Sequence, residues 1–376
     1  MSHGLLLAHL KNTRYLHGGA VYRESIRDLL VASEPGLEVE EIFVHDQQHP
    51  YRRLARQVFD LLTAPFSRYP AKVKHFCTRD FKRRVAALCA ARDYRLFVIN
   101  GADMLWTLDL LPAGAEALYI AHNIEHRLYR QQVEKYQNIP GLRALLAADA
   151  AKFEAFELAA LRRLSRIVCI SRPDADILQG YCQPGVRIAT IMPSFAYPPS
   201  VRRRRAGGGA LKLGFLGNLE WWPNRRGLDW FLNEVWPHLA ANRELHLYGQ
   251  GSRARQDGRR IFGHGFVADL ASVWAEIELM IQPITCGGGI NIKVAESLHN
   301  RMPILATPLA LRGLDLARDP AIVVLEGAKD WIDYLNSPGP EAQATLAPRE
   351  ENARLFNRDA NRAALTALLS PAPHDR

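Results

Sequence analysis

Three consecutive glycines, Gly287, Gly288 and Gly289, stand between a predicted strand and a predicted helix. Glycine lets a backbone approach a ligand closely, and the free N–H groups that open a helix bind anions, so this segment predicts a diphosphate site. Lys293, one turn into the helix, would add a positive charge, and Glu296 could accept hydrogen bonds from ribose hydroxyls. A glycine-rich turn beside a solvated Lys–Glu pair is the alternative interpretation.

A second glycine-bearing turn, 214–228, also separates a predicted strand from a predicted helix. It contains Gly217 and Asn218. Arg225 and Arg226 lie just before the predicted helix, where a guanidinium could bind two phosphate oxygens at once. A pair of arginines that contacts only solvent is the alternative.

Short apolar runs alternate with helical patterns around these turns, which is typical of βαβ units with a parallel sheet between helices. The 376 residues are enough for two such domains. A Pro-, Arg- and Gly-rich stretch, 197–210, has no hydrophobic period and is predicted to be a linker between domains 1–196 and 211–347. The helical segment 348–372 could return to the first domain. The predicted strands are 4–9, 39–44, 96–100, 117–121, 166–170, 211–216, 244–248, 280–282 and 304–307.

The overall composition is that of a globular chain. Hydrophobic residues make up 48% and charged residues 23%, far from disordered or collagen-like sequences. No apolar run approaches the ~20 residues that cross a bilayer, and the first residues lack the features of a signal peptide. The five cysteines show no CxxC or zinc-ligand spacing, which predicts reduced thiols. We expect a cytoplasmic protein.

Positive charge is concentrated in one part of the first predicted domain. The net charge is +9, and the window from Arg52 to Arg84 holds ten Lys or Arg side chains against Asp60 and Asp80. No motif that reads RNA or DNA accompanies it, so no nucleic-acid partner is expected. The pattern predicts a peripheral contact with anionic lipid on the inner face of the plasma membrane, and a solvated basic face is the alternative. The apolar side chains interleaved with these charges are Phe59, Leu61, Leu62, Phe66, Tyr69 and Phe76.

These motifs, in this order, resemble the bacterial glycosyltransferases of retaining family 4, and the resemblance is best over residues 211–315. It rests on the Gly-x-x-Gly-Asn-Leu turn with the following Trp-Pro-Asn, on the Phe-Gly-His-Gly-Phe-Val segment 262–267, and on the Gly-Gly-Gly-x-x-x-Lys-x-x-Glu-Ser stretch. The resemblance implies the GT-B fold, in which two Rossmann-like α/β domains face each other across a cleft.

The resemblance also implies roles for individual residues. Arg226 and Lys293 would hold the donor diphosphate, and Glu296 would hold the donor ribose. The backbone around Phe266 and Val267 would contact the nucleobase. The other residues expected at the donor are Gly217, Asn218, Arg225, Gly287, Gly288, Gly289 and Ile290.

The first half resembles the family more faintly. Gly18 and Gly19 match a glycine turn that approaches the donor phosphates and the acceptor, although a plain turn explains them equally well. His122 follows a predicted strand and matches the active-site histidine that faces the donor sugar, which makes it the best catalytic candidate. Glu125 and His126 are alternatives that are expected on the first turn of a helix.

Two features limit what the resemblance implies. Family members often have a glutamate where this chain has Gly288, so the sugar contact must come from backbone N–H groups or from elsewhere. Asp174 and Asp176 form an Asp-x-Asp pattern, but Ser171 three residues earlier indicates a helix N-cap with acidic residues near the positive end of the helix dipole. We therefore expect no metal and no cofactor.

The sequence predicts a metal-independent glycosyltransferase that moves a sugar from a nucleotide diphosphate to a glycan, lipid-linked or other hydroxyl acceptor. The resemblance implies retention at the anomeric carbon and a role in bacterial surface glycan or glycoconjugate synthesis. The alternatives are a nucleotide-sugar epimerase or hydrolase, a non-catalytic nucleotide-sugar-binding partner subunit, which Gly288 favours, and a basic membrane- or nucleic-acid-binding module. The donor base and sugar, the acceptor, the linkage and the oligomeric state stay open.

Overall fold

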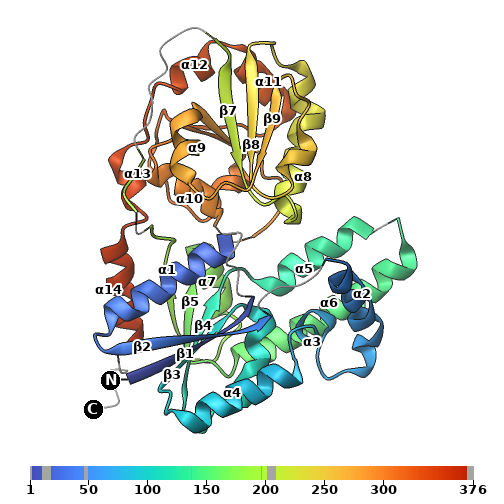
Figure 1. The fold of residues 1–376 in the computed structure, drawn as a ribbon, viewed down its shortest axis with the longest axis vertical. Coiled ribbons are helices and arrows are strands. Elements are labelled where there is room, and N and C mark those ends of the chain that lie inside the picture. Colours follow the sequence, from blue (N-terminus) through green and yellow to red (C-terminus); the bar gives the residue numbers. More distant parts are fainter. Residues whose placement is uncertain are drawn as a thin grey trace. The chain divides into compact units, whose positions relative to one another are not determined.

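The computed structural model describes residues 2–10, 18–45, 50–136, 138–195, 197–200, 209–288 and 290–370. The chain divides into two compact units, each built around one sheet (Figure 1). The first unit comprises Met1–Arg14, Arg23–Ile191 and Asp359–Arg376, and the second comprises Tyr15–Tyr22 and Met192–Arg358.

The sheet of the first unit has six parallel strands in the order β2-β1-β3-β4-β5-β6. These are β1 (Ser2–Leu10), β2 (Leu37–His45), β3 (Leu96–Asn100), β4 (Glu116–Ala121), β5 (Arg166–Cys169) and β6 (Arg187–Thr190). The helices are α1 (Gly18–Ser33), α2 (Pro50–Thr63), α3 (Ala71–Lys74), α4 (Arg79–Ala91), α5 (Glu125–Val133), α6 (Pro140–Leu161), α7 (Arg172–Gln179) and α14 (Arg358–Leu369), with 3-10 helices at Ala64–Phe66 (η1) and Ala102–Leu110 (η2).

Central strands of this sheet have apolar middle residues that are buried. All five residues of β3 are buried, and Leu5, Leu6 and Leu7 of β1 are fully buried. A parallel sheet that is covered on both faces needs such apolar strands, because neither face meets water. The large side chains of Phe97, from β3, and Phe153, from α6, complete this core.

The sheet of the second unit is also parallel, in the order β12-β11-β10-β7-β8-β9. Its strands are β7 (Leu211–Leu216), β8 (Arg243–Tyr248), β9 (Ile261–Gly265), β10 (Leu279–Gln282), β11 (Ile304–Ala306) and β12 (Ile322–Val324). Its helices are α8 (Trp222–Trp230), which continues into a π-helical turn at Phe231–Val235, α9 (Leu270–Glu276), α10 (Ile292–His299), α11 (Ala328–Asn336), α12 (Gly339–Gln343) and α13 (Glu350–Arg354).

The strand order of the second sheet reverses between β7 and β10, which are hydrogen-bonded neighbours. From β7 the chain proceeds to β8 and β9 on one side, and from β10 to β11 and β12 on the other. Ligands of such sheets bind outside the carboxyl ends of the strands at this reversal. The two glycine-bearing turns identified in the sequence directly follow β7 and β10.

The two parallel α/β sheets confirm the predicted fold class. The structure draws the division between the units at residues 191 and 192, before the predicted linker. Residues 197–200 pack on the second unit, because the Tyr197 hydroxyl donates to Glu296 and the Ser200 N–H donates to Asn300. Residues 201–208 lie outside the described residues.

The C-terminal segment is shared between the units. Helix α13 belongs to the second unit, while residues 359–370, which form most of α14, belong to the first. The guanidinium of Arg187, at the start of β6, donates to the carbonyl oxygens of Ala367 and Ser370 and thereby ties α14 to the first sheet. Among the helices that the structure describes, none is long and apolar enough to cross a membrane.

Candidate active site

Lys293 lies in the first turn of α10, at the carboxyl end of β10. Its Nζ atom donates a hydrogen bond of 2.7 Å to Oδ1 of Asn224, in α8, and lies 4.5 Å from the centre of the Phe215 ring, in β7. A Cβ atom at position 217 would lie 2.8 Å from Nζ, so the glycine there leaves the space that the ammonium occupies. Residues from β7, α8 and α10 therefore place one cation at the reversal of the strand order.

The ammonium of Lys293 has no carboxylate partner among the described residues. Burial lowers its pKa to about 7, because removal from water disfavours the charged form. A bound anion would restore the favourable interaction that water no longer provides. This position is therefore prepared for a negatively charged ligand.

Glu296, one turn further along α10, is 8% exposed. Its Oε1 accepts a hydrogen bond of 3.0 Å from the Tyr197 hydroxyl. Burial raises the pKa of Glu296 to about 7, and the Tyr197 hydrogen bond opposes that rise. A carboxylate with one hydroxyl partner in a buried site is suited to accept hydrogen bonds from the hydroxyls of a ligand.

The glycine segment after β10 approaches the start of α8. Gly287 has a φ of +129°, a backbone conformation that favours glycine, and a Cβ atom there would lie 3.7 Å from the Pro223 side chain. Gly288 is half-buried, and the side chain of Ile290 is buried in the second unit. Gly289 was predicted as part of the site and lies outside the described residues.

The close packing of α8 on the segment after β10 depends on a further glycine. A Cβ atom at Gly227 would lie 2.2 Å from the carbonyl oxygen of Pro283, so only glycine allows this approach. Arg225 and Arg226 lie on the exposed surface of α8, and neither side chain has a partner among the described residues. Their guanidinium groups are therefore available to a ligand.

Asn218 supports the turn after β7. Its side-chain oxygen accepts the N–H of Glu220 at 2.8 Å, and its carbonyl oxygen accepts Nδ2 of Asn224 at 2.9 Å. Asn224 in turn accepts the hydrogen bond from Lys293. The structure thus brings Gly217, Asn218 and Lys293 together, and Asn218 acts by holding Asn224.

Phe266 and Val267 follow β9, on a different part of the same sheet. Phe266 is 42% exposed, whereas Val267 packs partly against the apolar group around Tyr248 and Trp274. An exposed ring beside a backbone segment that follows a strand offers a surface for a planar base.

In the first unit, His122 directly follows β4, and its Nε2 lies 2.9 Å from Oδ1 of Asn100, the last residue of β3. Asn100 is buried, whereas His122 is half-buried. Because an amide oxygen only accepts, Nε2 of His122 carries a proton in this contact. The carboxyl ends of two neighbouring strands therefore present one oriented imidazole.

The alternatives to His122 begin α5, as expected. His126 is buried, and both its N–H and its Nδ1 lie 2.8 Å from Oε2 of Glu157. Glu125 pairs with Lys72 at 2.6 Å, and this pair, with a hydrogen bond from Asn123, lowers the pKa of Glu125. Both side chains therefore have protein partners.

Gly18 and Gly19 are the first two residues of α1. They therefore open a helix that follows β1, although the intervening residues 11–17 lie outside the described ranges. The N–H groups at the start of a helix are free to bind an anion or a carbonyl group.

Comparison with known proteins identifies the second unit. Residues 210–335 match the family model described as "Glycosyl transferases group 1", and this range contains the Lys293 site with both of its glycine-bearing turns. Over these residues the chain is therefore similar to the group 1 glycosyltransferases. No curated protein matches the chain by sequence.

Solved structures share the fold over nearly the whole chain. HepE from Anabaena, solved in complex with UDP and glucose, has a TM-score of 0.62 at 11% identity, covering 98% of this chain and 99% of HepE. TarM has a TM-score of 0.62 at 9% identity, covering 99% of both chains. WaaG, a glycosyltransferase involved in lipopolysaccharide biosynthesis, has a TM-score of 0.60 at 12% identity, covering 98% of this chain and 100% of WaaG. The chain therefore has the predicted GT-B fold.

The Asp-x-Asp pattern at Asp174 and Asp176 belongs to a helix start. The Ser171 hydroxyl accepts the N–H of Asp174 at 3.2 Å and donates to its carboxylate at 2.9 Å, so Ser171 is the N-cap of α7. Asp176 is exposed and pairs with Arg172, within the same helix. The predicted capping role of this segment is confirmed.

The sequence analysis did not single out three residues that the structure places at these sites. Asn224 stands in the Trp-Pro-Asn motif, which was the available signal, but its contact with Lys293 spans 69 residues. Tyr197 lies in a stretch that was interpreted as a linker, and no local pattern connects it with Glu296. Asn100 ends a correctly predicted strand, and a polar residue at that end was the signal for its contact with His122.

Proposed function

We propose that the second unit binds the diphosphate of a nucleotide sugar at Lys293. The observation that supports this proposal is the partly buried ammonium of Lys293, which has no carboxylate partner among the described residues and lies at the reversal of the strand order. The N–H groups of the glycine segment after β10 add donors to the same diphosphate. Glu296 accepts the ribose hydroxyls, in competition with the hydroxyl of Tyr197.

The same groups would serve the reaction. When the bond between the sugar and the diphosphate breaks, negative charge develops on the leaving phosphate, and a preorganised cation lowers the free energy of that state. Lys293 supplies this cation, and the exposed Arg226 closes on the phosphate once it is bound. Following the family resemblance, we propose transfer with retention and without a metal at the phosphate, which NMR analysis of the anomeric configuration of the product tests.

We propose UDP as the nucleotide, which the complexes of HepE with UDP and glucose and with UDP-glucose support. Calorimetric titration of the purified chain with UDP, GDP and ADP, in the presence of a chelator, tests this assignment. The proposal expects selective binding of UDP. Selective binding of GDP or ADP would show that the donor carries a different base. Binding of none of the three would overturn the proposed donor site.

The position of the donor is tested by Lys293→Ala, for which we expect an affinity about 100-fold lower, because a charge-assisted contact in a partly buried site is lost. Lys329→Ala is the matched control, since Lys329 is an exposed lysine of the same unit, paired with Asp333. Equal affinity of the two variants would show that the nucleotide binds elsewhere.

We infer that the acceptor is a hydroxyl of a surface glycan or glycoconjugate. Structural neighbours include WaaB, a lipopolysaccharide outer core galactosyltransferase, and WaaG. Sucrose-phosphate synthase from Thermosynechococcus elongatus shares the fold as well, so the fold alone does not select the acceptor. Incubation with the nucleotide sugar and cell-envelope extracts, followed by mass spectrometry, tests the inference. Transfer only to a small soluble sugar would contradict it.

The basic window of the first unit suggests how a lipid-linked acceptor is reached. Many of its cations are neutralised inside the unit, which the count along the sequence could not show because Asp109 and Glu125 lie outside the window. Four apolar side chains on α2 and η1 nevertheless remain exposed: Val58, Phe59, Leu62 and Phe66, the last of them 94% exposed. The cations with carboxylate partners are Arg56, Arg68, Lys72, Lys74 and Arg84.

We propose that this apolar face of α2 and η1 lies on anionic lipid. The Nζ atom of Lys74 lies 5.2 Å from the centre of the Phe59 ring, so positive charge borders the apolar side chains. Apolar insertion with bordering cations is the combination that holds a helix at a charged bilayer surface.

Sedimentation with vesicles of phosphatidylcholine, with and without phosphatidylglycerol, tests the lipid contact. The triple variant Phe59→Ser, Leu62→Ser, Phe66→Ser should bind the anionic vesicles about tenfold more weakly than the wild type. Val31→Ser, at an exposed apolar residue of α1, is the matched control. Equal binding of both variants, or equal binding to both kinds of vesicle, would contradict the proposal.

A further inference from the structure

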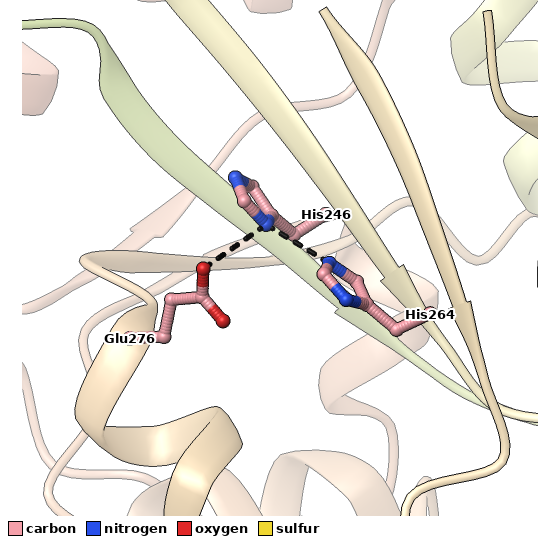
Figure 2. Close-up of side chains that lie close together, drawn as sticks. All are labelled: His246, His264 and Glu276. Carbon is pink, nitrogen blue, oxygen red and sulfur yellow. Dashed lines mark hydrogen bonds and ion pairs between the residues drawn. The ribbon is translucent and has the colours of Figure 1, made fainter. Parts of the chain in front are cut away.

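Two histidines and a glutamate lie together on one face of the second sheet, apart from the Lys293 site (Figure 2). His246 comes from β8, His264 from the neighbouring β9, and Glu276 is the last residue of α9. Nδ1 of His246 lies 3.1 Å from Nε2 of His264 and 3.6 Å from Oε1 of Glu276. The three potential ligand atoms all lie within 4.8 Å of one another.

We propose that His246, His264 and Glu276 bind a zinc ion. Two imidazole nitrogens and a carboxylate oxygen form a ligand set that zinc accepts, and solvent can fill a fourth position. In a tetrahedral site with zinc–ligand distances of about 2.0–2.1 Å, neighbouring ligand atoms are about 3.3 Å apart. The two separations from His246 bracket this value, and the third pair of ligand atoms lies within 4.8 Å, so the side chains must draw closer there to form the site.

The surroundings of the cluster support the assignment. His246 is only 5% exposed, and its second nitrogen, Nε2, lies 3.4 Å from Oε2 of Glu244. A histidine that binds a metal commonly donates its other ring N–H to a carboxylate, which fixes the orientation of the ring. Glu276 is positioned as well, because its second oxygen, Oε2, accepts a hydrogen bond of 3.0 Å from the Tyr248 hydroxyl.

The rings of the cluster are stacked in a fixed order. The His264 ring is parallel to the Tyr248 ring, with their centres 4.4 Å apart and an angle of 9° between the planes. The centres of the His246 and His264 rings lie 5.2 Å apart, and the planes of the two rings differ by 11°. Both imidazoles are therefore already ordered before a metal binds, which lowers the entropic cost of binding.

One residue opposes the metal. Nζ of Lys212 lies 3.4 Å from Oε1 of Glu276, the same oxygen that faces His246. Because the Lys212 and Glu276 side chains are each 38% exposed, the ammonium can turn into solvent when a cation takes its place. We therefore expect that removal of the Lys212 charge strengthens zinc binding.

The site would connect three elements around a segment of functional interest. His264 precedes and Glu276 follows the stretch that contains Phe266 and Val267, which the family resemblance assigns to the nucleobase. A metal that joins β8, β9 and the end of α9 would hold both ends of this stretch in place. The ion thus has a structural role and takes no part in the transfer reaction.

Zinc binding is tested on the untagged full-length chain after treatment with a chelator and removal of that chelator by dialysis. Titration with Zn²⁺ in competition with a chromophoric chelator should give one ion per chain. Substitution with Co²⁺ should give visible absorption bands of the intensity that is typical of four-coordinate cobalt. Failure of the wild type to bind one Zn²⁺ would overturn the proposal.

Variants locate the ion. We expect His264→Ala to weaken zinc binding by about 100-fold or more, since even changes outside the ligand set cost 10–100-fold. Glu276→Gln, which keeps an oxygen for the Tyr248 hydroxyl, should weaken it by about tenfold, and Lys212→Met should strengthen it. His238→Ala is the matched control, because His238 is an exposed histidine of the same unit.

These variants keep the test valid even if the substitution of the buried His246 disturbs folding. His264 is half-buried and Glu276 partly exposed, so their variants test the site even where His246→Ala does not fold. Zinc should raise the midpoint of thermal unfolding of the wild type and of His238→Ala, and should leave that of His264→Ala unchanged. Equal zinc affinity of His264→Ala and His238→Ala would overturn the proposal.

Discussion

The two units are built on the same plan, six parallel strands between helices, but they treat charge differently at the carboxyl ends of their strands. In the first unit, Lys72 pairs with Glu125 at 2.6 Å, and His126 contacts Glu157 at 2.8 Å. In the second unit, Lys293 and Glu296 have only neutral hydrogen-bond partners among the described residues.

Paired charges, as in the first unit, stabilise a fold. Buried charges without an opposite charge, as in the second unit, are suited to bind a ligand. A buried ion without an opposite charge costs free energy, and a protein that keeps one retains it for binding or catalysis. The first unit offers an oriented imidazole, His122, in contact with the amide of Asn100. The comparison supports the proposal that the second unit binds the charged nucleotide.

The largest effect is expected at His122, where substitution should separate turnover from nucleotide binding. If His122 faces the reacting sugar, as the family resemblance implies, His122→Ala should lower kcat about 100-fold and should leave the affinity for UDP unchanged. Asn100→Ala, which frees the ring, should lower kcat about tenfold. Steady-state kinetics and calorimetry on the same samples provide the two readouts. Loss of UDP affinity in His122→Ala would break the assignment of separate roles to the two units.

Stability should distinguish a paired lysine from an unpaired one. Lys72→Met leaves Glu125 without its cation and should lower the free energy of unfolding by about 2 kcal/mol, less than for a fully buried pair because Lys72 retains 32% exposure. Lys293→Met removes an unpaired cation and should raise it by about 1 kcal/mol. Chemical denaturation followed by circular dichroism measures both. Changes of the same sign would contradict the comparison.

The gain from Lys293→Met should depend on pH. The pKa of Lys293 is about 7 in the folded protein, below its ordinary value of 10.5, so the unfolded chain binds the extra proton between these values and wild-type stability rises with pH there. The advantage of the Met variant is therefore complete below pH 7 and fades toward pH 10. A constant advantage across this range would show that the ammonium is not destabilised by burial.

Glu296→Gln should show the opposite pH dependence at about the same or a smaller magnitude. The pKa of Glu296 is raised to about 7 from 4.5, so the folded protein binds the extra proton between these values and wild-type stability falls as pH rises through them. The variant, which retains an acceptor for the Tyr197 hydroxyl, should gain stability up to about 1 kcal/mol above pH 7. Unfolding at pH 5 and pH 8 tests this, and a larger gain at pH 5 would contradict it.

The smallest effect is expected at Tyr197, whose hydroxyl competes with the ribose for Glu296. Tyr197→Phe should increase the affinity for UDP about two- to threefold, because the ribose no longer displaces a protein hydrogen bond. The affinity for uracil alone, which carries no ribose, should not change. A lower UDP affinity in this variant would show that the hydroxyl contacts the nucleotide directly.

Much of the fold could be predicted because its central strands carry their own signal. Strands such as β3 and β7 are apolar runs, and the structure contains them where the pattern predicts them. The edge strands β6, β9 and β12 were not predicted. Their residues are largely half-exposed, so no apolar run marks them, and only pairing with a neighbouring strand makes them strands.

The candidate site could be located from the sequence where glycines and charges stand close together, as at Gly287 and Lys293. The partners that determine the state of these groups are distant: Asn224 is 69 residues from Lys293, and Tyr197 is 99 residues from Glu296. The cluster around His246 shows the same limit, because its ligands come from three separate elements and show no metal-ligand spacing. Spacing along a chain reveals contacts within one turn or helix, whereas these depend on the register of the sheet.

The return of α14 has a consequence for synthesis. The chain reaches this helix only after the whole second unit has been made, yet Arg187 of the first unit donates to carbonyl groups at its end. The first sheet therefore leaves the ribosome before the helix that completes it, and the second unit is translated in the interval. The unit that begins first is the one that finishes last.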